Sequence, residues 1–317
     1  MKKCLAIFVT IVLIVSACAL CACNGDELTL YVPDGAPALS VAKIVGDGKV
    51  GNNKITTVVT TGPAVQAKCA SGEADIAVLP TNAAVKICAS RGDYLLFSIN
   101  VYGVLYIVGT EHIDSLADLV GHTLHSIGQS NTPQFVFQTV CNAQGVSHND
   151  IDVVYHDDAS EIIPQIVAGK VQFALIGEPA VTQLKAKAAE KGISVETLFD
   201  LQQLWQSATG SNESGYPQAS MIVKKDLLTD RFAAQLMNAL KANAQHLSTH
   251  CDQLKTLLQG VGSALQLNYT AELIANCNIT AIPASEAVQD LNTYLITFPA
   301  LADLLPLSSD LIYETSN

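Results

Sequence analysis

Arginine is the residue that this chain most conspicuously lacks. Only Arg91 and Arg231 occur among its 317 residues. The planar arginine fork is the side chain best suited to hold phosphate or carboxylate groups with two hydrogen bonds. A site that binds a phosphate or sulfonate through several arginines is therefore not expected in this chain.

Positive charge and aromatic side chains are also scarce. The net charge is −12, and it becomes −14 without Lys2 and Lys3 of the leader, because 15 basic residues then face 29 acidic ones. Such an acidic surface disfavours nucleic acid and anionic lipid, so no nucleic-acid partner is expected. Apolar residues make up 49% of the chain and aromatic residues only 6%. This composition and length suit two α/β domains with packed layers of aliphatic side chains.

The common catalytic and metal-binding motifs are missing as well. The chain has no P-loop, dinucleotide fingerprint, G-x-S-x-G or H-E-x-x-H motif. His246 and His250 are spaced as zinc ligands on a helix, but we interpret them as exposed polar residues near a helix end. The five cysteines after Cys23 contain no C-x-x-C pair, and their odd number leaves at least one free thiol. Cys251 and Cys277 could form a disulfide. We predict no catalytic residues, no metal and no cofactor.

The N-terminus has the features of an export signal. Lys2 and Lys3 form a short positive region, and residues 5–15 are apolar but too short to span a membrane comfortably. The stretch VSACALCACNGDE then resembles a lipobox, the signal for lipid attachment to a bacterial lipoprotein. Both Cys18 and Cys23 fit, and the polar residues that follow favour Cys23. We expect a signal peptide over residues 1–22 and a lipid anchor on the extracytoplasmic face of a bacterial membrane.

Strand and helix patterns alternate in two blocks. Strands are expected at 28–32, 54–59, 75–79, 123–127, 151–155, 171–176 and 218–223, with helices between them and a mostly helical region after Asp226. Repeated βα units predict an α/β fold with mostly parallel sheets flanked by helices. The apolar run 95–108, broken by Gly103, is too long for one ordinary strand.

Most of the candidate site residues lie in five strand-to-helix loops, PDGAP (33–37), TTGP (60–63), PTN (80–82), GQSNTP (128–133) and GEP (177–179). Proline suits the first helical turn, and free N–H groups at each helix start attract polar ligand atoms. Parallel strands would bring such loops together as a pocket for a small polar ligand. The candidate ligand-binding residues are Asp34, Gly35, Thr61, Gly62, Thr81, Asn82, Ser130, Asn131, Thr132, Glu178 and Tyr216.

Three of these residues have alternative interpretations. Asp34 either caps the helix that follows it or contacts the ligand. Glu178 either complements the helix dipole or binds an N–H donor of the ligand. Tyr216 either stacks on a planar ligand or only packs its own loop. Because arginine is scarce, a neutral or cationic nitrogen heterocycle is favoured over a sulfonate or nitrate.

The segments VPDGAPALSVAKI, ASGEADIAVLPTNAA, GQSNTPQF, IGEPAV and GYPQASMIV, in this order after a lipobox, resemble type 2 periplasmic-binding-protein-like solute-binding lipoproteins of ABC importers. The most similar branch contains binders of sulfonate, nitrate, taurine and thiamine-pyrimidine precursors. The resemblance implies two lobes, with residues 23–108 and 218–317 in lobe 1 and residues 109–217 in lobe 2.

The resemblance also implies a role. It implies a non-enzymatic, monomeric protein that captures a small polar nitrogen- or sulfur-containing solute between its lobes. Its partners would be an ABC permease and the ATPase of that permease. Two alternatives remain, namely an enzyme of the same fold that resembles pyrimidine-precursor synthases and a surface ligand sensor without a transport role.

Overall fold

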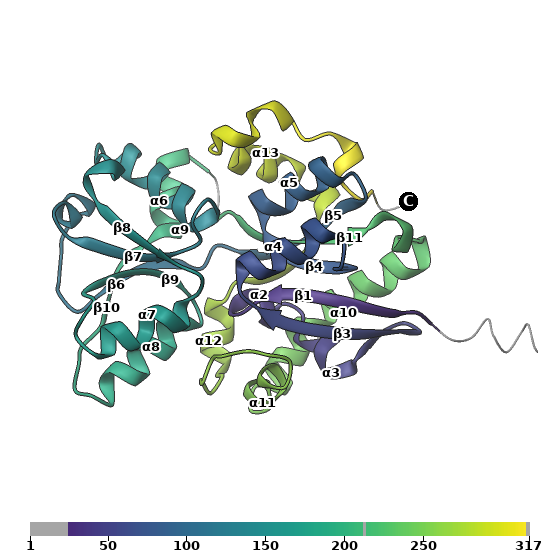
Figure 1. The fold of residues 1–317 in the computed structure, drawn as a ribbon, viewed down its shortest axis with the longest axis horizontal. Helices are drawn as coiled ribbons and strands as arrows, with labels where there is room; N and C mark the ends of the chain where they lie inside the picture. Colours follow the sequence, from purple (N-terminus) through teal and green to yellow (C-terminus); the bar gives the residue numbers. More distant parts are fainter. Residues whose placement is uncertain (1–24, 212–213, 315–317) are drawn as a thin grey trace, which may run out of the picture.

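The computed structural model describes residues 25–211 and 214–314, and it arranges them as two α/β lobes side by side (Figure 1). We call the part built on the seven-stranded sheet lobe 1 and the part built on the five-stranded sheet lobe 2. Cys18, Cys23 and the rest of the leader lie outside the described residues. Within these two ranges, none of the helices combines the length and apolar character that crossing a membrane requires.

Lobe 1 contains both ends of the described chain. Its sheet has the strand order β12-β5-β11-β4-β1-β3-β2. The strands are β1 (Glu27–Pro33), β2 (Lys49–Val50), β3 (Asn53–Thr60), β4 (Ile76–Pro80), β5 (Tyr94–Tyr102), β11 (Pro217–Lys224) and β12 (Ile279–Pro283). Its helices are α2 (Ala36–Leu39), α3 (Ala42–Asp47), α4 (Gly62–Ser71), α5 (Thr81–Arg91), α10 (Asp230–Thr249), α11 (Leu254–Gln259), α12 (Ala271–Asn276) and α13 (Val288–Leu295).

Lobe 2 is formed by one continuous segment, drawn in teal in Figure 1. Its sheet has the order β10-β6-β9-β7-β8. The strands are β6 (Leu105–Gly109), β7 (Thr123–Ile127), β8 (Asp152–His156), β9 (Phe173–Gly177) and β10 (Glu196–Asp200), and the helices are α6 (Thr132–Ala143), α7 (Ala159–Val167), α8 (Ala180–Ala189) and α9 (Leu201–Thr209). Short 3-10 helices occur in both lobes, at η1 (Leu116–Leu119), η2 (His148–Asp150), η3 (Lys225–Leu227), η4 (Ala284–Glu286), η5 (Pro299–Leu304) and η6 (Ser309–Leu311).

Each sheet combines three adjacent parallel strands with antiparallel strands. Strand β1 is parallel to β3 and β4, and β7 is parallel to β8 and β9. Strand β11 is antiparallel to β4 and β5, and β6 is antiparallel to β9 and β10. The predicted α/β class with flanking helices is therefore confirmed, whereas the parallel arrangement is limited to three adjacent strands of each sheet. The strands that follow the two crossings, β6 and β11, run antiparallel to the neighbouring strands β9 and β4.

The overlong apolar run divides at Gly103. Strand β5 before it belongs to lobe 1 and β6 after it to lobe 2, so the first crossing lies at residues 103–104 rather than at the expected boundary after Val108. Gly103 has φ 71°, and a Cβ there would lie 2.9 Å from Gln202 Cγ and 3.1 Å from Gly215 Cα. Gly215 lies on the second crossing and has φ 106°. The two crossings therefore pass in a contact that only glycine accommodates.

The cysteines of the described chain are all free thiols, so the disulfide considered for Cys251 and Cys277 is not formed. Cys69, Cys88, Cys141 and Cys277 are buried. Burial raises the pKa of Cys88 to about 12, which keeps this thiol protonated and unreactive. These cysteines act as small apolar side chains in the core.

Candidate functional site

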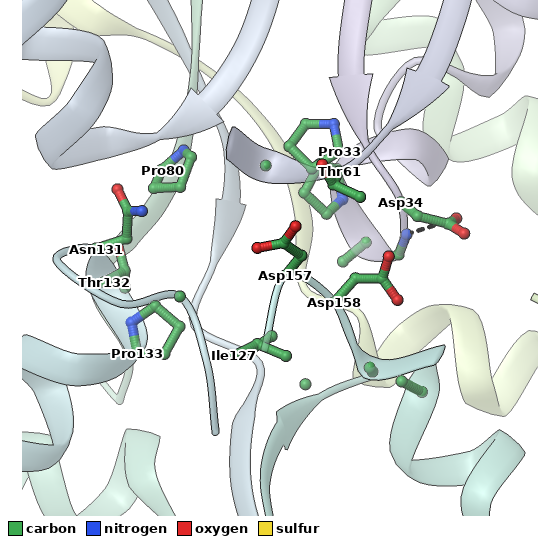
Figure 2. A pocket seen from close by; sticks show the side chains of 18 of the residues that line it. Pro33, Asp34, Thr61, Pro80, Ile127, Asn131, Thr132, Pro133, Asp157 and Asp158 are labelled. Atoms are coloured by element: carbon green, nitrogen blue, oxygen red, sulfur yellow. Dashed lines mark hydrogen bonds between the residues drawn. The ribbon is translucent and has the colours of Figure 1, made fainter. Parts of the chain in front are cut away.

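A cavity of about 320 Å³ lies between the two lobes (Figure 2). Loops from both sheets line it. Lobe 1 contributes residues 33–37, 60–63, 80, 218–219 and 265, and lobe 2 contributes residues 104–105, 127–129, 131–133, 155–160, 177–178 and 180. Its volume is near the lower end of the range for small-molecule sites, so it suits a compact solute.

The strand directions explain why these loops meet. The parallel strands β1, β3 and β4 of lobe 1, and β7, β8 and β9 of lobe 2, all end at the cavity, and a helix begins directly after each of them. The ligand-binding edge of such a sheet is the edge where its parallel strands end. Prolines fix several of the first helical turns, as in α4, where the Thr61 hydroxyl also accepts a hydrogen bond from Ala64 N at 3.4 Å.

Asp34 lines the cavity, and its carboxylate accepts three hydrogen bonds from the protein. Asp34 Oδ1 accepts hydrogen bonds from Gly35 N at 2.9 Å and from Ser263 Oγ at 2.7 Å, and Oδ2 accepts one from Ala264 N at 2.7 Å. The dashed line at Asp34 in Figure 2 marks the hydrogen bond from Gly35 N. Asp34 therefore fastens the β1–α2 loop to the C-terminal part of lobe 1.

Glu178 makes the helix-start contacts of the first interpretation, and its contact with a ligand stays a prediction. It lines the cavity, is only 9% exposed, and accepts hydrogen bonds from Thr182 N at 3.1 Å and from Thr182 Oγ1 at 3.0 Å. It therefore completes the first turn of α8 while it faces the cavity. Burial raises the pKa of Glu178, and the Thr182 hydrogen bonds and the charge of Lys185 oppose this shift only in part.

The loop after β8 contributes residues that the sequence analysis did not select. Asp158 caps α7 and accepts a hydrogen bond from Ser160 N at 2.7 Å. Asp157 is exposed, and Figure 2 shows its carboxylate directed into the cavity. His156 Nε2 lies 2.9 Å from His125 Nδ1, and burial and the nearby His156 lower the pKa of His125. This strand-to-helix loop lacks proline, which was the feature that drew attention to the other five.

Seven of the eleven predicted site residues line the cavity, namely Asp34, Gly35, Thr61, Gly62, Asn131, Thr132 and Glu178. Thr81, Asn82 and Ser130 are not among the lining residues. Thr81 is buried against Ser220, with their hydroxyls 2.7 Å apart. Asn82 Nδ2 donates a hydrogen bond to the Ser130 carbonyl at 3.1 Å, which joins the two lobes beside the cavity.

The structure places Tyr216 outside the cavity lining, so it does not support the prediction of a stacking face for ligand. Tyr216 is 1% exposed and lies between Trp205 and Tyr294, with ring centroids 5.2 Å and 5.7 Å away. Its hydroxyl donates a hydrogen bond to Gln202 Oε1 at 3.0 Å. Packing of these aromatic rings leaves Tyr216 no face for a solute.

Further hydrogen bonds join the lobes around the cavity. Gln266 N donates to Gln183 Oε1 at 3.0 Å, and Gln66 Nε2 donates to Asn131 Oδ1 at 3.4 Å. The Tyr294 hydroxyl donates to Thr132 Oγ1 at 2.7 Å. The described conformation therefore has its lobes in contact on several sides of the cavity.

No group of three or more histidine, cysteine, aspartate or glutamate side chains in the described ranges is arranged to hold a metal ion. The His246 and His250 rings stack with their centroids 4.5 Å apart. The side chains that line the candidate site include carboxylate, amide, hydroxyl and imidazole groups.

Comparisons with known proteins agree with this architecture. The family model described as "NMT1/THI5 like" matches residues 94–254. No curated protein matches the chain in sequence. Among solved structures, an ABC transporter protein from Parabacteroides distasonis is 22% identical, with a TM-score of 0.72, and the match covers 92% of this chain and 99% of that chain.

Two other solved structures have the same fold at lower identity. The alkanesulfonate-binding protein SsuA from Xanthomonas axonopodis pv. citri, bound to MOPS, is 16% identical, with a TM-score of 0.65 and coverage of 91% of this chain and 96% of that chain. The periplasmic nitrate-binding protein NrtA from Synechocystis is 13% identical, with a TM-score of 0.60 and coverage of 88% and 84%. With its two sheets, its cavity between them and a family match over half of its length, the chain belongs to the NMT1/THI5-like family.

Proposed function

We propose that the protein is an extracytoplasmic solute-binding lipoprotein of an ABC importer. It captures one small polar solute that contains nitrogen or sulfur, and it delivers this solute to a permease that is driven by an ATPase. The observation that carries the proposal is the cavity of about 320 Å³ between two lobes, lined by helix starts of both sheets. The family membership and the solved binding proteins of the same fold support it.

The two crossings supply the hinge in this proposal. Lobe 1 consists of residues up to 102 and from 217 onward, and lobe 2 of the segment between them. Gly103 and Gly215 lie in contact at the crossings, and both have positive φ. Few backbone groups need to rotate at such a hinge for the lobes to open and close around a solute. A lipid on Cys23, or on Cys18, would hold the protein beside its permease and raise its local concentration there.

A binding role accounts for the cavity better than an enzymatic role does. Among the described residues, no hydroxyl group that lines the cavity is hydrogen-bonded to a histidine, as an activated nucleophile would be. Asp34 and Glu178 instead accept hydrogen bonds from backbone N–H groups and shape the loops. These features fit a site that recognises a solute and releases it unchanged.

Native mass spectrometry of the purified protein tests solute capture. We expect one small molecule per chain, bound reversibly. A Cβ at Gly62 meets no atom within 4 Å, and Gly62 lines the cavity, so Gly62→Leu should keep the fold and exclude the solute. Ala67→Leu, on an exposed position of the same helix, is the matched control.

Equal solute content in the Gly62→Leu and Ala67→Leu proteins would contradict binding in this cavity. The transport step needs a separate measurement. If binding is intact but deletion of the protein leaves cellular uptake of the solute unchanged, the surface sensor becomes the better interpretation.

A further inference from the structure

We propose that the cavity selects a positively charged nitrogen compound with N–H donors, such as a primary ammonium, an amidinium or a guanidinium. This inference rests on the proposed function, because it names the class of solute that the site between the lobes takes. It gives the solute a charge opposite to that of the sulfonates and nitrate named for two structural relatives.

The first observation is the charge of the cavity wall. Four carboxylates line it, those of Asp34, Asp157, Asp158 and Glu178, and no lysine or arginine occurs among its described lining residues. They come from three loops, after β1, β8 and β9, which lie far apart in the sequence. Charges that share a cavity with low-dielectric walls act together on a solute and are screened less than surface charges. Such a wall attracts a cation and repels an anion.

The second observation concerns the helix starts, which are the usual anion sites of such folds. The protein's own carboxylates already accept hydrogen bonds from several of these N–H groups. Asp34 accepts from Gly35 N, Asp158 from Ser160 N, and Glu178 from Thr182 N. An anionic solute would have to compete with these fixed carboxylates for the same backbone donors. A cation can instead donate hydrogen bonds to the remaining lone pairs of these carboxylates, which the helix starts hold in place.

The third observation concerns the exposure of two of these carboxylates, those of Glu178 and Asp157. Glu178 is 9% exposed, and its side chain accepts its hydrogen bonds from Thr182, while none of the described lysines or arginines forms an ion pair with it. Asp157 projects into the cavity from an exposed loop position (Figure 2). Together they place one buried and one accessible carboxylate on the wall of the same small cavity. A bound cation would offset the desolvation that raises the pKa of Glu178.

The kind of cation follows from the remaining lining. Tyr155 is the one Phe, Tyr or Trp side chain among the described lining residues, so the cavity lacks the aromatic cage that holds quaternary ammonium groups. Asn131 and Gln129 add amide oxygens, and the carboxylates add more acceptors. A solute that donates several N–H hydrogen bonds matches this lining.

Isothermal titration with two four-carbon probes of opposite charge tests the inference. Butylammonium and butane-1-sulfonate share one alkyl chain and differ in the head group. We expect butylammonium to bind at least about tenfold more tightly, with an affinity that falls as salt is added. Asp157→Asn should weaken butylammonium binding about three- to tenfold, because Asp157 is partly screened by solvent. Asp252→Asn, an exposed carboxylate outside the cavity, should leave it unchanged.

Equal or tighter binding of butane-1-sulfonate would overturn the inference and leave the proposed function standing. If neither probe binds, the charge of the solute recovered by native mass spectrometry decides whether the inference stands. A cationic solute supports the inference, and a neutral or anionic one overturns it. The absence of any bound solute in both experiments would overturn the proposed function and this inference together.

Discussion

Gln202 holds the two crossings together, and its replacement gives a prediction with a calculable size. Gln202 is the second residue of α9 and is 4% exposed. Its Nε2 donates to the Leu105 carbonyl at 3.1 Å and to Asp200 Oδ1 at 3.0 Å. Its Oε1 accepts from Leu105 N at 2.8 Å and from the Tyr216 hydroxyl at 3.0 Å. One side chain thus binds β6, just after the first crossing, and Tyr216, at the second.

Gln202→Met keeps the length of the side chain and removes all four hydrogen bonds. The Leu105 N–H, the Leu105 carbonyl and the Tyr216 hydroxyl then lose these partners in a buried region, whereas Asp200 keeps its bonds to the start of α9. A buried polar group without a partner costs about 1–3 kcal/mol. Three such groups give a loss of about 3–9 kcal/mol, and relaxation of the loop favours the lower end. This is a large part of the 5–15 kcal/mol that stabilises a typical protein.

Urea unfolding followed by circular dichroism measures the free energy of unfolding. Gln203→Met is the matched control, because Gln203 is the next residue on the same helix and is exposed. We expect a loss of at least about 3 kcal/mol for Gln202→Met, by the magnitude above, and almost none for the control. A difference below about 1 kcal/mol between the two variants would refute the claim that this amide holds the crossings together.

Three more predictions concern the hinge and the cavity. Gly103→Ala should lower the free energy of unfolding by about 2–4 kcal/mol in urea titrations, since its positive φ and the neighbouring Gln202 leave no place for Cβ; an unchanged value would show that the crossing relaxes. Burial raises the pKa of Glu178, so wild type should lose stability relative to Glu178→Gln as pH rises from 4.5 through the raised pKa. Parallel curves of stability against pH for the two proteins would contradict this. Burial and the nearby His156 lower the pKa of His125, so wild type should lose more stability than His125→Gln as pH falls from 6.5 through the lowered pKa. Thermal unfolding at several pH values measures this, and equal acid sensitivity of the two proteins would argue against it.

The central strands of both sheets were predictable because their signal is local. The expected strands 28–32 and 123–127 correspond to β1 (Glu27–Pro33) and β7 (Thr123–Ile127). Apolar runs bounded by glycine or proline mark such strands regardless of their neighbours. The edge strand β12 gave no such signal, because it pairs with β5, which lies far away in the sequence. Strand β2, which pairs with the neighbouring β3, is only two residues long and too short to give one.

Helix length was less predictable than helix position. A helix was expected between the strands 28–32 and 54–59, but the chain forms α2 and α3 there, with a break at Ser40 and Val41. At this break the Ser40 hydroxyl donates to the Pro37 carbonyl at 2.7 Å. A side chain that bonds its own backbone competes with helix formation. This local competition is not visible in the apolar periodicity.

The candidate site was predictable as a set of loops and not as a set of contacts. Proline near each helix start identified five loops and missed the sixth, at residues 156–160, which carries Asp157 and Asp158. The burial of Tyr216 depends on Trp205 and on Tyr294, a residue from the C-terminal region, and sequence spacing does not reveal this contact. The excess of carboxylates in the cavity likewise arises only when distant loops meet.

Hydrogen–deuterium exchange with and without the solute that co-purifies tests the central claim most directly. If the solute lies between the lobes, it should slow exchange in loops of both, at residues 60–63 of lobe 1 and at residues 128–133 and 177–182 of lobe 2. Protection that is confined to one lobe, or that lies away from these loops, would contradict capture in the cavity between them.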